Sequence, residues 1–235
     1  MPKYANKCPQ HTELDLYKGC SFNCIYCISY EREQKNDFNL EKELRKIADN
    51  QTDGFPYYLS PWIDAYQHQE AEKMYTRQII NELHKKNHPF FVITKSVLIK
   101  RDLEFFKNQE NTFIAISLNT LNNKITEVFE SGAPSASERK QLLEELVADK
   151  SLKVVVKIDP IIPGVTDGEE LTQLLNWLSD LKPYAVTAET LRLTKNIANR
   201  ISRLVDKLLI NRILMHYPEL NLQHLLYYQF YDVKK

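Results

Sequence analysis

Short apolar runs alternate with amphipathic segments along most of this chain. Two of the runs read Phe-Phe-Val-Ile-Thr and Val-Val-Val-Lys-Ile. Nearly continuous apolar runs of this length are typical of strands buried on both faces, as in a parallel sheet. The predicted strands cover residues 13–17, 55–59, 90–94, 112–118, 153–159 and 185–193.

The segments between these runs predict helices. Within residues 70–86, for example, apolar side chains recur near helical spacing, which indicates one face turned toward a core. The predicted helices cover residues 40–49, 70–86, 103–108, 137–148, 169–179 and 196–216. Six β–α alternations predict an α/β fold, a partial (β/α)6 TIM-like barrel of parallel strands with outer helices. In such folds the site lies at the C-terminal ends of the strands.

Length and composition exclude several classes of protein. The chain has 235 residues and no low-complexity tract or long linker, so we expect a single domain over 1–235, with a C-terminal helix and tail at 195–235. Its 31 basic and 31 acidic side chains balance, which argues against strong non-specific binding to nucleic acid. No apolar run reaches membrane-spanning length, and we find no signal peptide. Four cysteines do not suit a secreted disulfide scaffold, so a cytoplasmic location is expected.

Three of the cysteines lie in one loop directly after the first predicted strand. Cys20, Cys24 and Cys27 have the spacing C-x3-C-x2-C. Three thiolates on a compact loop can bind three irons of a cubane cluster, because such clusters are held by cysteine thiolates. A closed electron carrier would use four cysteines. The fourth iron would therefore keep an open position where a small molecule can bind and react.

Other interpretations of these cysteines stay open. Zinc could bind Cys8 and His11 together with Cys24 and Cys27, in a C-x2-H…C-x2-C arrangement. Cys24 and Cys27 could instead form a redox-active pair. Both alternatives leave Cys20 unexplained. A third alternative, three buried structural cysteines without a metal, does not suit the hydrophilic, turn-like surroundings of the motif.

The cysteine motif, with Tyr26 directly before its last cysteine, resembles the signature of the radical S-adenosylmethionine (SAM) superfamily. The resemblance extends over about residues 14–193. Within this superfamily, the sequence resembles the branch that contains spore photoproduct lyase and the DNA repair photolyase-like proteins. The segments that carry this resemblance are residues 17–27, 60–67, 93–96, 101–103 and 159–164.

This resemblance implies two cofactors, a [4Fe-4S] cluster on the three cysteines and SAM on the open iron. Tyr26 and Ile161 would border the adenine, and Lys95 would pair with the SAM carboxylate. The loop that begins at Ser60 would meet the amino group. Ser117 and Asn119 would contact carboxylate or ribose hydroxyl groups. Arg192, on the sixth strand, is a further candidate contact.

The implied activity is the reductive cleavage of SAM to methionine and a 5′-deoxyadenosyl radical, which takes hydrogen from a bound substrate. A one-electron reductant such as flavodoxin or ferredoxin would supply the electron. The branch favours a nucleotide or nucleic-acid lesion, while the neutral charge favours a small molecule over long duplex DNA. A non-catalytic zinc- or iron–sulfur-binding module is the alternative function.

Candidate substrate contacts lie in the loop after the second strand. Asp64, as an unpaired loop carboxylate, and Tyr66 are the predicted catalytic residues, and Trp62 and Tyr58 are further candidates. Spore photoproduct lyase carries a cysteine hydrogen donor in this segment, but this chain has no cysteine between residues 55 and 69. We therefore do not expect this chain to have spore photoproduct lyase activity. A C-terminal aromatic cluster is predicted to cap the barrel or to form a dimer contact: Tyr227, Tyr228, Phe230 and Tyr231.

Overall fold

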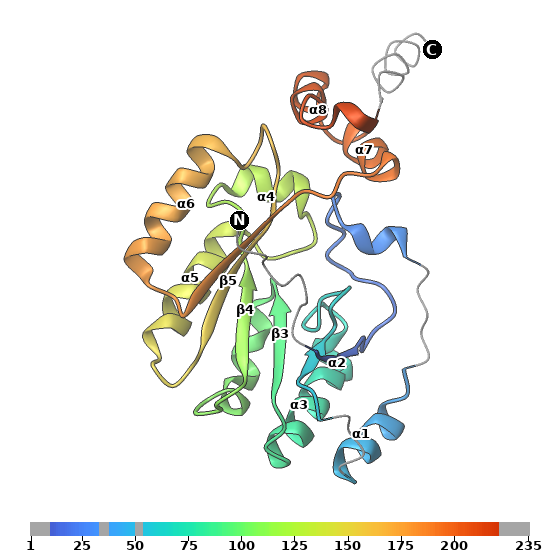
Figure 1. Cartoon of the computed structure of the whole chain (residues 1–235), viewed down its shortest axis with the longest axis vertical. Helices are drawn as coiled ribbons and strands as arrows, with labels where there is room; N and C mark the ends of the chain where they lie inside the picture. Colours follow the sequence, from blue (N-terminus) through green and yellow to red (C-terminus); the bar gives the residue numbers. More distant parts are fainter. Residues whose placement is uncertain (1–9, 33–37, 50–53, 221–235) are drawn as a thin grey trace, which may run out of the picture.

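The computed structural model describes residues 10–32, 38–49 and 54–220 (Figure 1). Its six strands are parallel and pair in sequence order from β1 to β6. The sheet is open, because β1 and β6 lie at its two edges in the described part of the chain. The predicted partial (β/α)6 architecture is confirmed. The strands are β1 (Thr12–Leu14), β2 (Tyr57–Leu59), β3 (Phe90–Thr94), β4 (Phe113–Ser117), β5 (Val154–Ile161) and β6 (Ala185–Thr190).

The two faces of the sheet differ in burial. Along β3 and β5, fully buried side chains alternate with half-buried ones. On β3 the half-buried residues include Phe91, whose ring stacks on Tyr58 of β2 at 4.4 Å and on Phe113 of β4 at 4.8 Å between centroids. The continuous apolar runs thus arise because one face packs on helices and the other carries an aromatic row. The prediction of strands buried on both faces is only partly right.

Helices cover the outer face of the sheet (Figure 1). Apolar side chains of α1, α3, α5 and α6 pack with the strands in the main core. No helix in the described residues is long and apolar enough to cross a membrane. The α-helices are α1 (Leu40–Ala48), α2 (Glu70–Lys73), α3 (Tyr75–Lys85), α4 (Asn123–Phe129), α5 (Ala136–Ala148), α6 (Gly168–Leu181), α7 (Lys195–Ser202) and α8 (Lys207–Leu214). The 3-10 helices are η1 (Ile28–Glu31), η2 (Val97–Phe105) and η3 (Pro218–Leu220).

Several predicted helices have different bounds. The segment 70–86 divides into α2 and α3 at Met74, whose φ of 52° is left-handed. The Glu70 carboxylate accepts hydrogen bonds from the N–H groups of Thr76 and Arg77, so a buried side chain caps the new start. The segment 196–216 likewise divides into α7 and α8, where Asp206 accepts from the Leu209 N–H at 2.9 Å. Residues 103–108 belong partly to η2, and η1 and α4 were not predicted.

A second, smaller core lies at the C-terminal ends of the strands. There α7 and α8 pack against the loop that carries the cysteines (Figure 1). Its buried members include Phe22, Ile25, Tyr26, Phe129, Leu191, Ile197, Ile201, Ile210 and Ile213. This core positions the cysteine loop over the open end of the sheet. The predicted aromatic cluster at 227–231 lies outside the described residues.

Candidate functional site

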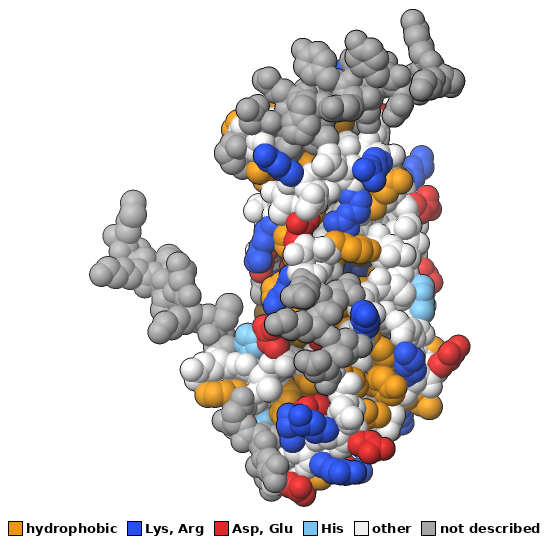
Figure 2. Space-filling model, turned by 90° about the vertical axis from the view of Figure 1, so that its right-hand side faces the viewer, with side chains coloured by type: hydrophobic (Ala, Val, Ile, Leu, Met, Phe, Trp, Pro, Cys, Tyr) orange, Lys and Arg blue, Asp and Glu red, His pale blue; other side chains and the backbone are white. Residues whose placement is uncertain are grey.

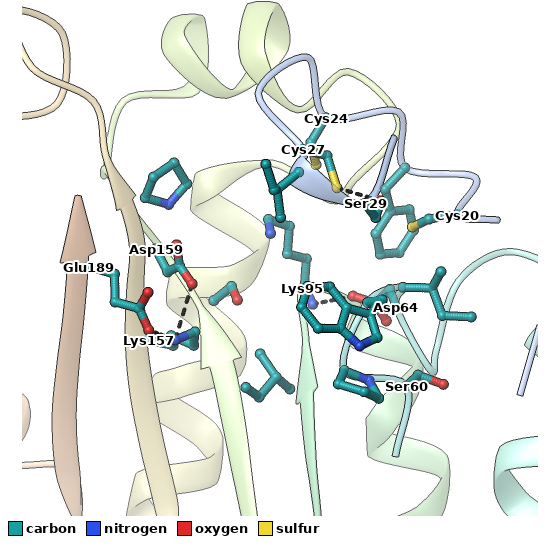
Figure 3. Close-up of a pocket in the computed structure, with 18 of the residues that line it drawn as sticks. Cys20, Cys24, Cys27, Ser29, Ser60, Asp64, Lys95, Lys157, Asp159 and Glu189 are labelled. Atoms are coloured by element: carbon teal, nitrogen blue, oxygen red, sulfur yellow. Dashed lines mark hydrogen bonds and ion pairs between the residues drawn. The ribbon is translucent and has the colours of Figure 1, made fainter. Parts of the chain in front are cut away.

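A cavity of about 410 Å³ opens at the C-terminal ends of the strands, below the cysteine loop (Figure 3). It is lined by that loop, by the loop after β2 and by the concave ends of the later strands. The predicted site residues that line it are Cys20, Cys24, Cys27, Tyr26, Tyr58, Ser60, Trp62, Asp64, Lys95, Ser117 and Arg192. Tyr66, Asn119 and Ile161 are not among the lining residues.

All three cysteines are free thiols, with Cys24 buried and the other two half-buried. Cys27 lies 2.8 Å from the Ser29 hydroxyl, and its N–H donates to the Cys24 carbonyl at 3.1 Å. Burial raises the pKa of Cys24 to about 12. Burial and the nearby charge of Asp64 raise the pKa of Cys20 to about 11. Metal binding at these positions therefore has to displace thiol protons.

The loop after β2 holds the cysteine loop through Gln67. Its side-chain amide donates to the Gly19 carbonyl and accepts from the Ser21 N–H, both at 2.8 Å. The backbone on both sides of Cys20 is thus bonded to one fully buried side chain. The His68 N–H adds a bond to the Ser21 hydroxyl at 3.2 Å. The sequence analysis missed Gln67, although it lies in a segment that carried the family resemblance.

Gly132, just after α4, lets a second backbone segment approach the same loop. Its N–H donates to the Phe22 carbonyl at 3.1 Å, and the Ile25 N–H donates to the Phe129 carbonyl at 3.0 Å. A Cβ at position 132 would lie 2.6 Å from the Ser21 carbonyl oxygen. Real side chains do not approach so closely, so this contact requires glycine.

A buried ionic network connects the cysteine loop to the sheet. Glu130 accepts hydrogen bonds from the Tyr26 hydroxyl and from the Arg139 guanidinium. Arg139 also donates to the Ser117 carbonyl at 3.0 Å, at the end of β4. Burial raises the pKa of Glu130, but Arg139, Lys95 and the Tyr26 hydroxyl together hold it below its ordinary value. Glu130 is therefore a buried carboxylate that fixes Tyr26 in place.

Lys95, at the end of β3, presents a cation to the cavity. Its Nζ lies 4.0 Å from Glu130 and 5.9 Å from the centroid of the Tyr26 ring. Burial lowers the pKa of Lys95, but the neighbouring Cys24 and Glu130 outweigh this effect, and the pKa is raised overall. The ammonium group is therefore charged and available to an anionic ligand.

Asp64 is not the unpaired carboxylate that was expected. It accepts hydrogen bonds from the Tyr66 N–H at 2.8 Å, the Thr94 hydroxyl at 2.6 Å and the Lys95 N–H at 2.8 Å. These bonds fix the loop after β2 to the end of β3, and the carboxylate still borders the cavity (Figure 3). Burial raises the pKa of Asp64, while the three bonds oppose the shift. Its catalytic role stays a prediction.

Tyr66, in the same loop, does not line the cavity. It is completely buried, and burial together with the charge of Asp102 raises its pKa well above the ordinary value. A role for Tyr66 in contact with substrate stays a prediction that the cavity lining does not support.

Charged side chains of β5 and β6 line the opposite wall (Figure 3). Lys157 forms ion pairs with Asp159 at 3.1 Å and with Glu189 at 3.3 Å. Glu189 also pairs with Arg192, which is largely exposed. The sequence predicted Arg192, with Glu189 or Asp159 as a possible structural partner, and the ion pair with Glu189 is present; Lys157 was missed. Its position near the C-terminal end of a strand was the signal that could have identified it.

The remaining predicted residues differ in their surroundings. Ser60 directly follows β2 and has a positive φ of 56°, and its hydroxyl accepts a hydrogen bond from the Leu16 N–H at 3.4 Å. The Trp62 indole N–H donates to Glu13 at 3.1 Å. Asn119 is buried, and neither atom of its amide has a hydrogen-bond partner among the described residues. A buried amide without partners suits a polar ligand group.

Three cysteine thiols on one loop are the kind of donor set that a cubane cluster requires. Among the described residues, no three Cys, His, Asp or Glu side chains converge as one metal ion requires. In a cubane each thiolate binds a different iron, so three thiols spread along one loop are suitable. Cys8, which the zinc alternative needs, lies outside the described residues.

A match to a known protein family identifies the family of this chain. Residues 14–178 match the family model described as "Radical SAM superfamily". The chain belongs to the radical SAM superfamily. Members of this superfamily are enzymes that use SAM, and their iron–sulfur cluster agrees with the donor set described above.

Solved structures of radical SAM enzymes share this fold. Streptococcus suis SuiB bound to S-adenosylmethionine superposes with a TM-score of 0.60 at 14% identity, covering 83% of this chain and 46% of SuiB. A spore photoproduct lyase mutant with bound AdoMet and dinucleoside spore photoproduct gives 0.61 at 17% identity, covering 82% of this chain and 60% of the lyase.

Curated relatives are longer than this chain. An uncharacterized protein of Methanocaldococcus jannaschii is 26% identical over 178 residues, which is 73% of this chain and 66% of the relative. An uncharacterized protein of Mycobacterium tuberculosis is 28% identical over 199 residues, which is 75% of this chain and 57% of the relative. The chain therefore spans about three fifths of the relatives that it matches.

Proposed function

We propose that this protein is a radical SAM enzyme that carries a [4Fe-4S] cluster on Cys20, Cys24 and Cys27. It cleaves SAM reductively, and the resulting 5′-deoxyadenosyl radical takes hydrogen from a substrate. When bound, the cluster supplies the electron that breaks the S–C5′ bond of SAM. The observation that carries the proposal is a loop of three free cysteines above a cavity that is also lined by a half-buried cation, Lys95.

The chain's own residues supply binding and orientation. Lys95 pairs with the SAM carboxylate, because its ammonium is charged and faces the cavity. Ser60 lies where the amino group of SAM is bound, and Ser117 and Asn119 donate to carboxylate or ribose oxygens. The unpartnered amide of Asn119 supports this assignment. Tyr26, fixed by Glu130, borders the adenine. The same role for Ile161 rests on the family resemblance, since Ile161 does not line the cavity.

The substrate side of the cavity lies along β5 and β6. We propose that Arg192 and Lys157 contact polar groups of the substrate and that Trp62 and Tyr58 offer it aromatic surfaces; all four side chains line the cavity. We propose a nucleotide, a nucleic-acid lesion or a small molecule as the substrate. On the face shown in Figure 2, basic and acidic side chains are interspersed, which supports a small ligand over long duplex DNA. Flavodoxin or ferredoxin is the proposed reductant.

Reductive cleavage of SAM tests the proposal. Anaerobically reconstituted protein, reduced with dithionite, is expected to release 5′-deoxyadenosine and methionine. Cys20→Ala is expected to abolish this release, and Cys8→Ala is expected to leave it unchanged. A colourless protein that binds one zinc, and that loses this zinc in Cys8→Ala but not in Cys20→Ala, would instead establish the non-catalytic zinc module.

A further inference from the structure

Arg200 of α7 contacts the cysteine loop and is not one of the residues that line the cavity. Its Nη2 donates to the Cys27 carbonyl at 3.4 Å. Its guanidinium carbon lies 3.9 Å from the centroid of the Tyr30 ring, in the 3-10 helix that follows Cys27. One side chain thus binds both the last cysteine of the motif and the segment that leads away from it.

The second terminal nitrogen of the Arg200 guanidinium, Nη1, is buried and lacks a hydrogen-bond partner among the described residues. A charged donor without an acceptor is costly in the folded protein, because its hydration is lost without replacement. An anionic group at the cysteine loop would satisfy this donor. The cluster proposed above, with its thiolates and sulfides, is such a group.

The helix that carries Arg200 is fixed to the same segment at a second place. Glu31, at the end of η1, accepts hydrogen bonds from the Thr194 hydroxyl at 3.1 Å and from the Asn196 amide at 3.0 Å. Ile197 and Ile201 of α7 are buried in the core that also contains Cys24 and Tyr26. Arg200 is therefore held in position by its helix, and its charge has a fixed place relative to Cys27.

From these contacts we infer that Arg200 is a positioning residue for the iron–sulfur cluster, which orients Cys27 and raises the reduction potential of the cluster by its positive charge. The inference rests on the proposed function. Reduction adds one negative charge to the cluster, and a nearby cation stabilises that charge. Because α7 follows the strands that carried the family motifs, nothing in the cysteine motif itself indicates this residue.

A redox titration monitored by electron paramagnetic resonance (EPR) tests the inference on reconstituted wild type, Arg200→Lys, Arg200→Gln and Arg203→Gln. Arg203 is an exposed residue near the end of the same helix and serves as the control. We expect a lower midpoint potential and an altered EPR signal in Arg200→Gln, a partial return toward wild type in Arg200→Lys, and no change in Arg203→Gln. The same potential and signal in Arg200→Gln and wild type would overturn the inference.

Two further measurements separate an effect of Arg200 on cluster binding from an effect on the stability of the fold. They are the iron content of the reconstituted proteins and the thermal melting of the iron-free proteins. If Arg200→Gln melts like the wild type but binds less iron, the positioning role is supported. If its melting temperature falls while the loaded fraction keeps the wild-type potential, Arg200 is a structural residue only and the inference fails. A wild type that binds no cluster would overturn the proposed function itself, whereas a loaded wild type matched by Arg200→Gln would overturn only the role of Arg200.

Discussion

Gln67 binds the backbone on both sides of Cys20, although the two residues lie in different loops. The amide donates to the Gly19 carbonyl and accepts from the Ser21 N–H, each at 2.8 Å. An amide side chain is suited to this task because it offers a donor and an acceptor in one plane. The loop after β2 therefore determines the position of Cys20, the first of the three proposed cluster ligands.

Replacing Gln67 by Ala is expected to lower cluster loading and to destabilise the fold. The Gly19 carbonyl and the Ser21 N–H would lose their partner, at a cost of about 1–3 kcal/mol. Iron and sulfide per chain after anaerobic reconstitution, together with thermal melting, measure both effects. Gln69→Ala is the matched control, since the Gln69 side chain accepts a bond from the surface residue Lys73. Equal loading in both variants would contradict the assigned role.

Gly132→Ala is expected to displace the cysteine loop. The added methyl group would lie 2.6 Å from the Ser21 carbonyl oxygen and 2.8 Å from that of Phe22, and backbone atoms cannot yield easily. Iron content should fall well below that of the wild type, with a lower melting temperature. Ser131→Ala, at an exposed neighbouring position, controls for general effects of mutation at this turn. Wild-type loading of the Gly132 variant would show that the close contact does not matter.

Glu130→Gln should destabilise the protein by about 3–5 kcal/mol at neutral pH, because it leaves Arg139 buried without its anionic partner. The folded-state pKa of Glu130 is lowered from the ordinary 4.5, so its contribution is present above that pH and is lost as the pH falls below it. Denaturant unfolding at pH 7 and near pH 4 measures this change. We expect the gap between wild type and variant to narrow in acid.

The matched control for this experiment is Glu127→Gln, an exposed residue of α4. It should unfold like the wild type at both pH values. A gap between wild type and Glu130→Gln that stays constant or widens in acid would contradict the ionic account of the network.

Lys95→Met is expected to weaken SAM binding while the cluster is retained. A charge-assisted hydrogen bond contributes about 1.5–3 kcal/mol, so the dissociation constant should rise about ten-fold or more. Equilibrium binding of SAM to the iron-loaded protein measures the change. The control is Lys100→Met, because Lys100 pairs with Glu145 away from the cavity lining. Unchanged affinity in the Lys95 variant would remove this residue from the SAM site.

The local features of the molecule were largely predictable. Apolar runs predicted the strands, and the spacing of the three cysteines predicted a common ligand set. Each of these signals is contained within a short stretch of sequence. The single domain over 1–235 and the cytoplasmic location are expectations that stay predictions.

The supporting contacts were not predictable, for a physical reason. Tyr26 and Glu130 are 104 positions apart, and Arg139 lies in a helix whose other charged residues are mostly exposed. From the sequence alone, a charged residue that is buried in an amphipathic helix cannot be distinguished from one that is exposed to solvent. Only the tertiary contact identifies it. The same holds for Asp64, whose three bonds come from its own loop and from the end of β3. Sequence patterns indicate where a ligand set lies but not what holds it.

The proposed function requires a [4Fe-4S] cluster that Cys20, Cys24 and Cys27 would hold, with one iron open to SAM. EPR of the anaerobically reconstituted, dithionite-reduced protein, recorded before and after SAM is added, tests it most directly. We expect about four irons per chain and a cluster signal that changes when SAM binds. A cluster signal that SAM leaves unchanged, or a protein that reconstitutes without iron, would contradict the proposed function.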